Sequence, residues 1–294
     1  MSEKASINFI IPGFVVKYRI SYAKGVFIMM KVIVVGPRGK MGKLITQIAA
    51  EREDMQLIAG VGPSGRNYIG NDLGTVAMVG RELGVPVVDD LESVIDKCDV
   101  IIDFSTKEMA MTVLDLAIGH KKALVCGTTG FSSEEMQRFK DAALHIPMLY
   151  AANTSKLVNI MNKLIELVTE AAGEDLDIEI LEMHDRWKKD APSGTSKEMG
   201  EKMAHILGKE LSDAAVYGRE GASPRVPGTI GYHSLRAGNI PSSHTVFFGG
   251  MGERLEITHH SYNWECFARG ACDCAAYLEG KEPGYYTIKD VLNL

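Results

Sequence analysis

Short apolar runs alternate with amphipathic segments through the first half of the chain. The run at residues 31–36 is rich in β-branched residues, and Met41, Leu44, Ile45 and Ile48 follow it at helical spacing. Unbroken apolar runs of this length suit strands that are buried on both faces of a parallel sheet. Further strands are expected at residues 55–62, 85–90, 99–105, 121–130 and 146–153, with helices at 91–97, 107–118 and 133–143. This alternation predicts an α/β fold with a Rossmann-like, doubly wound parallel sheet.

The pattern changes after Asn153. Neighbouring short strands replace the strand–helix alternation, which indicates a second, α+β domain with an open mixed or antiparallel sheet. Helices are expected at 156–174 and 196–211, strands at 175–184, 229–238, 244–250 and 253–261, a last helix at 266–280 and a terminal segment at 286–294.

The first 28 residues fit neither pattern. Pro12 and Gly13 interrupt their apolar stretch, and Lys17, Arg19 and Lys24 follow the stretch rather than precede it. A secretory signal carries its cations first, so none is expected here. We treat residues 1–30 as an N-terminal extension and leave them out of the fold prediction.

Composition narrows the possible partners. The 294 residues carry a net charge of −6, which argues against a nucleic-acid or anionic-membrane surface. Apolar runs stay below the roughly 18 residues that a membrane span needs. The five cysteines are scattered, and Cys272 and Cys274 lack a second pair at zinc-site spacing. We expect a cytoplasmic protein with reduced thiols and no metal site.

Three glycines lie between the first strand and the first helix. Gly36, Gly39 and Gly42 have the spacing G-x-x-G-x-x-G. Glycines let the backbone approach a pyrophosphate, and a helix N-terminus adds free N–H groups and partial positive charge. We therefore predict dinucleotide binding, with a tight turn that binds no ligand as the alternative.

The second strand lacks the acidic residue that commonly holds a ribose 2′-hydroxyl. It ends in Gly-Pro-Ser, and the polar or cationic residues in or near this region are Arg38, Lys40, Ser64 and Arg66. A missing acid and available cations favour a 2′-phosphate. We therefore expect NADPH as the cofactor, with NADH as the alternative.

Two further strand ends are expected at the cofactor. Ligands of open α/β sheets bind beyond the carboxyl ends of the strands. Phe104 and Ser105 follow one strand, and Gly127, Thr128 and Thr129 follow the next. Small side chains and backbone groups suit a nicotinamide ribose; ordinary strand-end turns are the alternative.

A series of motifs occurs in one order along the chain. It comprises G-x-x-G-x-M-G, IIDFS, CGTTGF, AAN, DIEILEMH, KKDAPSGTS, RVPGTIGYHSLRAG, HTVFF and ERLEITH. From about Lys31 to Leu294 the chain resembles the 4-hydroxy-tetrahydrodipicolinate reductase family, also called dihydrodipicolinate reductases. The most specific segment is H-x-x-x-K-x-D-A-P-S-G-T, with G-T-T-G-F ahead of it.

The resemblance implies a domain arrangement and a reaction. Residues 31–153 would bind the dinucleotide, completed by 265–294, and the inserted residues 154–264 would bind substrate and form a homotetramer. The family passes a hydride from NAD(P)H to a cyclic dicarboxylic imine, so that 4-hydroxy-tetrahydrodipicolinate becomes tetrahydrodipicolinate on the path to diaminopimelate and lysine. The matching motifs add Met41, Ala152 and Asn153 to the cofactor site.

The resemblance also assigns roles in the most specific segment. His184 matches the catalytic histidine, Lys188 matches the lysine four positions on, and Ser193, Gly194 and Thr195 match the turn that binds a substrate carboxylate. A histidine titrates near neutral pH and can supply the proton that follows a hydride. A lysine and a turn rich in donors suit a dicarboxylate.

Several positions depart from the family pattern. Asp185 lies in the substrate-binding segment where a second histidine is common, and a carboxylate there should repel a dianion unless a cation neutralises it. Trp187 precedes the lysine, Leu157 replaces a glycine, and Trp264 replaces an arginine. These residues indicate either a more aromatic pocket for a different imine or drift outside the site. Asp190 is interpreted as a turn-capping group.

Three functions stay open at this point. The leading one is the lysine-pathway reductase. The second is an NAD(P)-dependent imine reductase or amino-acid dehydrogenase of the same fold that acts on another small carboxylate, which Asp185 and Trp187 motivate. The third is a non-catalytic nucleotide-sensing or assembly protein, against which the retained His184 and Lys188 argue.

Overall fold

The computed structural model describes residues 4–11, 14–21 and 29–294. Near the N-terminus, β1 (Lys4–Ile11) and β2 (Phe14–Ser21) pair antiparallel as a two-stranded sheet of their own. The interruption predicted at Pro12 and Gly13 lies outside the described residues. Among the described residues, no helix is both long and apolar enough to cross a membrane.

Seven parallel strands form the larger sheet, in the order β14-β8-β7-β6-β3-β4-β5. Strand order runs outward in both directions from β3, which confirms the doubly wound topology predicted from the alternating pattern. The strands are β3 (Met30–Val35), β4 (Met55–Val61), β5 (Val87–Val88), β6 (Val100–Asp103), β7 (Ala123–Cys126), β8 (Pro147–Tyr150) and β14 (Gly284–Tyr286).

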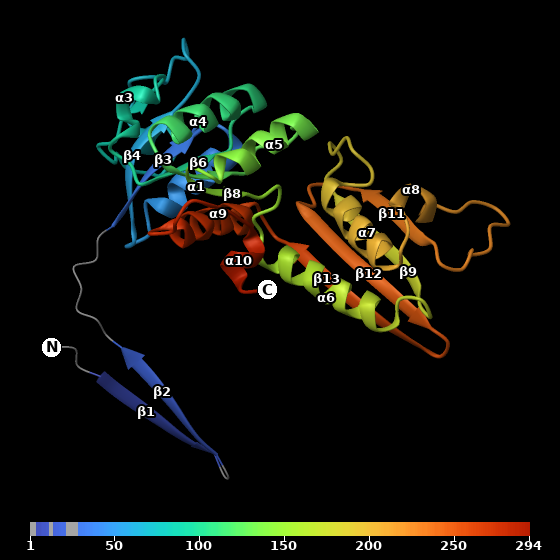
Figure 1. Ribbon diagram of the computed structural model, residues 1–294. Helices are drawn as coiled ribbons and strands as arrows, with labels where there is room; N and C mark the ends of the chain where they lie inside the picture. Colours follow the sequence, from blue (N-terminus) through green and yellow to red (C-terminus); the bar gives the residue numbers. More distant parts are fainter. Residues whose placement is uncertain (1–3, 12–13, 22–28) are drawn as a thin grey trace.

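Helices cover both faces of this sheet (Figure 1). Val32 and Val34 point to one face, where they share a core with Ile45 of α1 and Cys272 of α9, and Ile33 points to the other face. Successive strand residues face opposite sides, which explains why an unbroken apolar run is needed. The helices are α1 (Lys40–Ala49), α2 (Leu73–Val76), α3 (Glu92–Ile95), α4 (Lys107–Gly119), α5 (Ser133–Ala142), α9 (Glu265–Leu278) and α10 (Ile288–Leu292).

Five strands form the second sheet, in the order β10-β11-β9-β12-β13. β10, β11 and β9 are parallel, whereas β12 is antiparallel to both of its neighbours, so the predicted open mixed sheet is confirmed. Its strands are β9 (Asp177–His184), β10 (Ala215–Tyr217), β11 (Ile230–Arg236), β12 (Ser242–Gly250) and β13 (Glu253–Ser261). The helices α6 (Lys156–Ala172), α7 (Gly194–Ile206) and α8 (Leu211–Ala214) contribute to the core on one face.

Four short elements were not predicted: α2, α8, β10 and β14. Each has three or four residues, too few to show a helical or strand period. Several predicted elements were also too long. The helix expected over 91–97 is only Glu92–Ile95. The strands expected over 85–90, 121–130 and 146–153 are only Val87–Val88, Ala123–Cys126 and Pro147–Tyr150.

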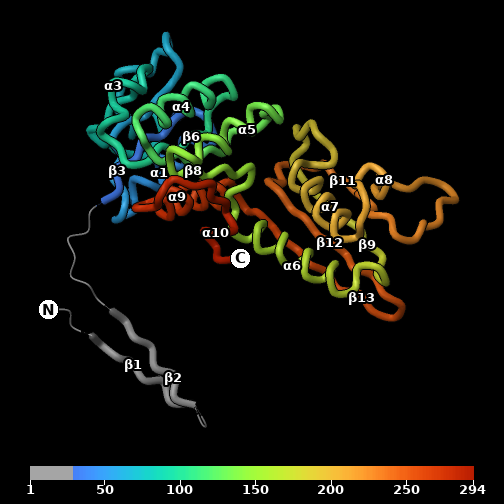
Figure 2. The backbone as a smooth tube through the Cα atoms, in the orientation of Figure 1, coloured from blue at the N-terminus to red at the C-terminus, as the bar shows by residue number. Residues whose placement is uncertain are grey.

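The chain crosses between the two sheets twice, once after β8 and once before α9 (Figure 2). The first crossing contacts α9, the helix that follows the second crossing. The Thr154 hydroxyl donates to the carbonyl oxygen of Phe267 at 2.6 Å, and a Cβ on Gly270 would lie 1.7 Å from the Thr154 carbonyl oxygen. Only glycine allows this approach, which brings the start of α6 against α9.

Candidate active site

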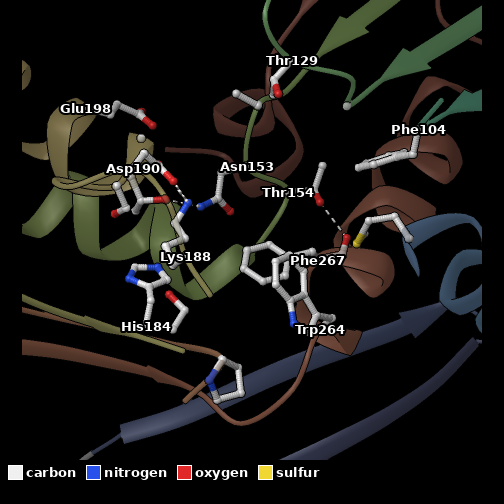
Figure 3. Close-up of a pocket in the computed structure, with 18 of the residues that line it drawn as sticks. Phe104, Thr129, Asn153, Thr154, His184, Lys188, Asp190, Glu198, Trp264 and Phe267 are labelled. Carbon is white, nitrogen blue, oxygen red and sulfur yellow. Dashed lines mark hydrogen bonds and ion pairs between the residues drawn. The ribbon is translucent and has the colours of Figure 1, made fainter. Parts of the chain in front are cut away.

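A cavity of about 710 Å³ lies between the two sheets. In Figure 3, His184, Lys188 and Asp190 gather at one end, Phe104 lies at the other, and Trp264 and Phe267 lie between them. It is lined by Met41, Phe104, Gly127, Thr129, Ala152, Asn153, Thr154, His184, Asp185, Lys188, Asp190, Ser193, Gly194, Thr195, Glu198, Pro241, Ser242, Trp264 and Phe267. A neighbouring cavity of about 420 Å³ adds Lys40, Ser105 and Thr128 from the predicted site.

The glycine-rich turn is built to bring backbone close to a ligand. Gly36 has φ +78°, and a Cβ on Gly42 would lie 2.1 Å from the Gly36 carbonyl oxygen, so α1 begins directly against the turn. Gly39 is the N-cap of α1, and within the described part of the chain no side chain caps the first N–H groups of this helix. Free N–H groups at a helix N-terminus suit a pyrophosphate, so the turn fits a dinucleotide.

A buried carboxylate holds the next two strand ends together. Asp103 accepts hydrogen bonds from the hydroxyls of Ser105 (2.5 Å) and Thr128 (3.0 Å), one from each turn. Burial raises the pKa of Asp103, although the hydrogen bonds oppose this. A Cβ on Gly127 would lie 2.1 Å from the Phe104 ring. Sequence reasoning identified the turns but missed Asp103, the residue that fixes them.

The second sheet contributes His184 at the end of β9. His184 is 7% exposed, and its Nδ1 lies 3.4 Å from Oε2 of the fully buried Glu182. Burial lowers the pKa of His184, with the charge of Glu182 opposing that effect. His244 lies alongside, with ring centroids 5.3 Å apart, and Arg236 donates to Glu182 Oε1 at 2.8 Å. Glu182, Arg236 and His244 were not predicted as site residues.

Lys188 reaches the same end of the cavity. Its Nζ lies 2.7 Å from Oδ1 of Asp190. The hydrogen bond from Lys188 lowers the pKa of Asp190. Asp190, interpreted from sequence as a turn cap, is therefore the ion-pair partner of Lys188 and an unpredicted cavity residue.

The Ser193 turn begins α7. Ser193 is the N-cap, and its hydroxyl accepts from the Ser196 N–H. The N–H groups of Gly194 and Thr195 lie in the first turn of the helix, where backbone N–H groups have no carbonyl partner within the helix. They can therefore donate to an anionic group. Asn153, at the crossing from the larger sheet, donates to the Thr195 hydroxyl at 3.2 Å. The predicted carboxylate site is thus tied directly to the predicted cofactor side.

Two of the four departures from the family pattern line the cavity. Asp185 and Trp264 do so, whereas Trp187 is 71% exposed and Leu157 is 62% exposed, both outside the lining. Both of these act on the cation Lys40, Trp264 by contact and Asp185 through its charge. Lys40 Nζ lies 3.6 Å from the Trp264 ring centroid; burial lowers the pKa of Lys40, and the charge of Asp185 opposes this. Lys40 thus supplies a cation that can offset Asp185.

Arg38, Ser64 and Arg66 are exposed and line neither cavity. The Ser64 hydroxyl donates to Asp89 Oδ2 at 2.8 Å. Asp89 follows β5, which pairs with the end of β4. An acid therefore does stand beside the end of the second strand. It was missed because it comes from another strand.

Three buried groups, Glu182, His184 and His244, have ligand atoms within 4.8 Å of one another. The carboxylate oxygens of Glu182 already accept from Arg236, Ser193 and Ser196. The geometry is therefore that of a hydrogen-bonded cluster around a charged pair.

Two family profiles match the chain. The profile "Dihydrodipicolinate reductase, N-terminus" covers residues 30–154, and "Dihydrodipicolinate reductase, C-terminus" covers residues 158–292. The chain belongs to the dihydrodipicolinate reductase family. The family predicted from the sequence motifs is confirmed.

Individual relatives of this dihydrodipicolinate reductase family member support the same family assignment. A 4-hydroxy-tetrahydrodipicolinate reductase of Hahella chejuensis is 42% identical over 267 residues, which are 90% of this chain and 100% of the relative. A dipicolinate-bound dihydrodipicolinate reductase from Paenisporosarcina sp. TG-14 is similar in structure, with a TM-score of 0.71, 27% identity, and coverage of 88% of this chain and 98% of that one. GenD2 from gentamicin A biosynthesis, in complex with NAD, shares the fold at a TM-score of 0.57 and 15% identity, with 90% of each chain covered.

Glu182 should make the stability of this family member depend on pH. Burial alone would raise the pKa of Glu182, but hydrogen bonds from Ser193 and Arg236 outweigh it and lower the pKa from 4.5 to about 2. Because the folded-state pKa is depressed, the stabilisation is fully present above pH 4.5 and is lost as the pH falls toward 2. Its size is about 3 kcal/mol.

Urea denaturation of the native protein and Glu182→Gln between pH 6 and pH 2.5 measures this contribution. The native free energy of unfolding should fall more steeply below pH 4.5 than that of the variant. Parallel curves for the two proteins would contradict the assignment.

Proposed function

We propose that the chain reduces 4-hydroxy-tetrahydrodipicolinate to tetrahydrodipicolinate with a nicotinamide cofactor, in diaminopimelate and lysine biosynthesis. The observation that carries this proposal is the shared cavity, with strand-end turns of the larger sheet on one side and His184 and Lys188 on the other. Family membership and the name of the Hahella relative support it. The Paenisporosarcina reductase binds dipicolinate, a planar dicarboxylate that suits a cavity with a lysine and a helix N-terminus.

Different residues of the cavity bind the substrate, supply the proton and compensate charge. A reduced nicotinamide supplies a hydride when bound. Lys188 and the N–H groups of Gly194 and Thr195 hold the substrate carboxylates and orient the imine. The 4-hydroxyl group of the substrate leaves as water, and His184 gives a proton to the carbon where negative charge collects after reduction, so one hydride and one proton enter and one water departs. Lys40 offsets the charge of Asp185, so the dianion can enter.

These roles support the division of the chain into a cofactor-binding and a substrate-binding domain. We assign dinucleotide binding to residues 31–153 with 265–294, and substrate binding and subunit contacts to residues 154–264. The five cysteines are free, and four of them are buried. Free thiols support a location of the protein in the reducing cytoplasm.

A reductase for a different small imine is the second candidate, because Asp185 and Trp264 belong to the cavity lining. A steady-state assay with enzymatically generated 4-hydroxy-tetrahydrodipicolinate separates the two. The native protein should turn it over efficiently. Reduction of another cyclic imine carboxylate, without turnover of this substrate, would favour the second candidate.

Two adjacent lysines give a matched test of the site. Lys188→Ala removes the cation in the cavity, whereas Lys189→Ala removes an exposed cation outside the lining. A charge-assisted contact of this kind contributes about 2 kcal/mol, so Lys188→Ala should lower kcat/KM by at least tenfold. Lys189→Ala should leave kcat/KM within about twofold of the native value. Equal losses in the two variants would contradict the role of Lys188.

For the cofactor, NADPH is the preferred proposal and NADH the alternative. Arg38 and Arg66 are exposed cations next to the turns at the ends of β3 and β4, which supports a 2′-phosphate. Asp89 acts in the opposite direction, because a carboxylate beside Ser64 repels a phosphate and accepts from a ribose hydroxyl.

The two effects can be separated by substitution. Arg66→Ala should lower kcat/KM for NADPH about tenfold and leave NADH unchanged, while Asp89→Asn should raise the NADPH-to-NADH ratio. Arg138→Ala, on α5, is the matched control for loss of a surface arginine. An unchanged cofactor ratio in both Arg66→Ala and Asp89→Asn would contradict this assignment.

A homotetramer is the assembly we propose. Residues of β9 alternate, so Ile178 and Ile180 face the helices while Leu181 and Met183 face the other side. Leu235 of β11 pairs with Met183 on that side and is 46% exposed. A strand face with partly exposed apolar side chains supports contact with another subunit.

Light scattering on the native protein should give four chain masses. Leu181→Arg on this face should reduce the assembly to dimers or monomers, because a charge would be buried at the contact. Leu144→Arg, at a position that is 77% exposed after α5, is the control. A native monomer, or a Leu181→Arg protein of native mass, would contradict the proposal.

A further inference from the structure

Glu182 is a buried charge that takes no direct part in the proposed reaction. It lies on β9 two residues before His184, and its side chain is fully buried. Its Oε2 accepts from the Ser193 N–H and the Ser196 hydroxyl, each at 3.1 Å, and its Oε1 accepts from Arg236 at 2.8 Å. A carboxylate this deep is tolerated only with such partners.

The same Oε2 faces the proton donor. His184 Nδ1 is buried, makes no hydrogen bond to any residue that the structure describes, and lies 3.4 Å from Glu182 Oε2. Catalytic hydrogen bonds are often long without a ligand and shorten in the reacting complex. A proton on Nδ1 directed at Glu182 leaves Nε2 as the nitrogen that carries the transferred proton.

We propose that Glu182 is a positioning residue for this reaction. One carboxylate oxygen fixes the tautomer of His184 and also holds the Ser193 turn, so the proton donor and the carboxylate site share a single reference point. Arg236 holds the other oxygen and keeps the carboxylate charged. This inference rests on the proposed function, since only a reaction that needs a proton needs this tautomer.

The surroundings of His184 determine how its titration depends on Glu182. Burial lowers its pKa, and Glu182 is the main group that opposes burial. His244, packed against the ring, stays neutral because burial lowers its pKa to about 3. The other charged groups that act on His184 are Lys188 and Arg236, which lower its pKa, and Asp190, which raises it. Removing the charge of Glu182 should therefore lower the pKa of His184 further.

Nitrogen NMR of the full-length protein with ¹⁵N-labelled histidine tests the tautomer directly, with His184→Asn used to assign the signals. The neutral His184 ring should carry its proton on Nδ1. In Glu182→Gln the pKa of His184 should fall by about one unit. The value of kcat should fall about tenfold, and the pH profile of kcat should move to lower pH.

Glu179→Gln is the matched control. Glu179 lies three residues earlier on β9, on the opposite face, and binds Arg219 at 2.7 Å and His233 at 2.8 Å, much as Glu182 binds Arg236 and faces His184. This variant should leave the pKa of His184 and kcat unchanged. A comparable fall in both variants would show a general effect of losing an ion cluster and would overturn the proposal.

Two NMR results would also overturn it: a neutral His184 protonated on Nε2, or a His184 pKa that Glu182→Gln leaves unchanged. If Glu182→Gln does not fold, the tautomer in the native protein decides. The NMR results do not depend on turnover. Failure of the proposed function would instead appear as a native protein with the expected tautomer that does not reduce the substrate.

Discussion

The contact between Thr154 and Gly270 is the constraint on which the site depends. The chain leaves the larger sheet after β8 and returns to it as α9, and the first crossing packs against α9 with no room for a Cβ at Gly270. The contact places the start of α6 against α9, and Asn153 next to it bonds to Thr195. The turns that suit a dinucleotide and the groups that suit a dicarboxylate therefore line one cavity.

Charge balance is the second requirement of this cavity. A dianionic substrate would meet Asp185 and Asp190 in the cavity lining, with Glu182 buried behind His184, and a cation acts on each of these three acids. Glu182 is held by Arg236, Asp190 by Lys188, and Asp185 acts on Lys40, which stacks on Trp264. The Lys40 contacts come from the larger sheet, so this part of the balance exists only when the two halves of the site are assembled.

Much of the fold was predictable because its signals are local. Unbroken apolar runs and the spacing of Gly36, Gly39 and Gly42 are visible in a few residues, and they predicted the doubly wound sheet and its turn. The motif around His184 and Lys188 likewise identified the family. β14 could not be predicted this way, because three residues carry no period and its pairing with β8 is non-local.

The residues that support the site could not be predicted, because their contacts are also non-local. The alternation along β9 makes Glu182 a core position, but nothing near it in sequence indicates Arg236, which lies 54 residues away. Asp89 was missed because it reaches the end of β4 from a neighbouring strand. Trp187 and Trp264 were grouped from sequence, and only the three-dimensional arrangement separates the exposed one from the one in the cavity.

A crystal structure with dipicolinate and reduced cofactor tests the central claim most directly. The account predicts that the ligand lies in the cavity between the sheets, with a carboxylate on Lys188 and the N–H groups of Gly194 and Thr195. The ring should lie between His184 and the turn at Gly127–Thr129. Dipicolinate bound away from Lys188, or a cofactor that does not reach the Gly127 turn, would contradict it.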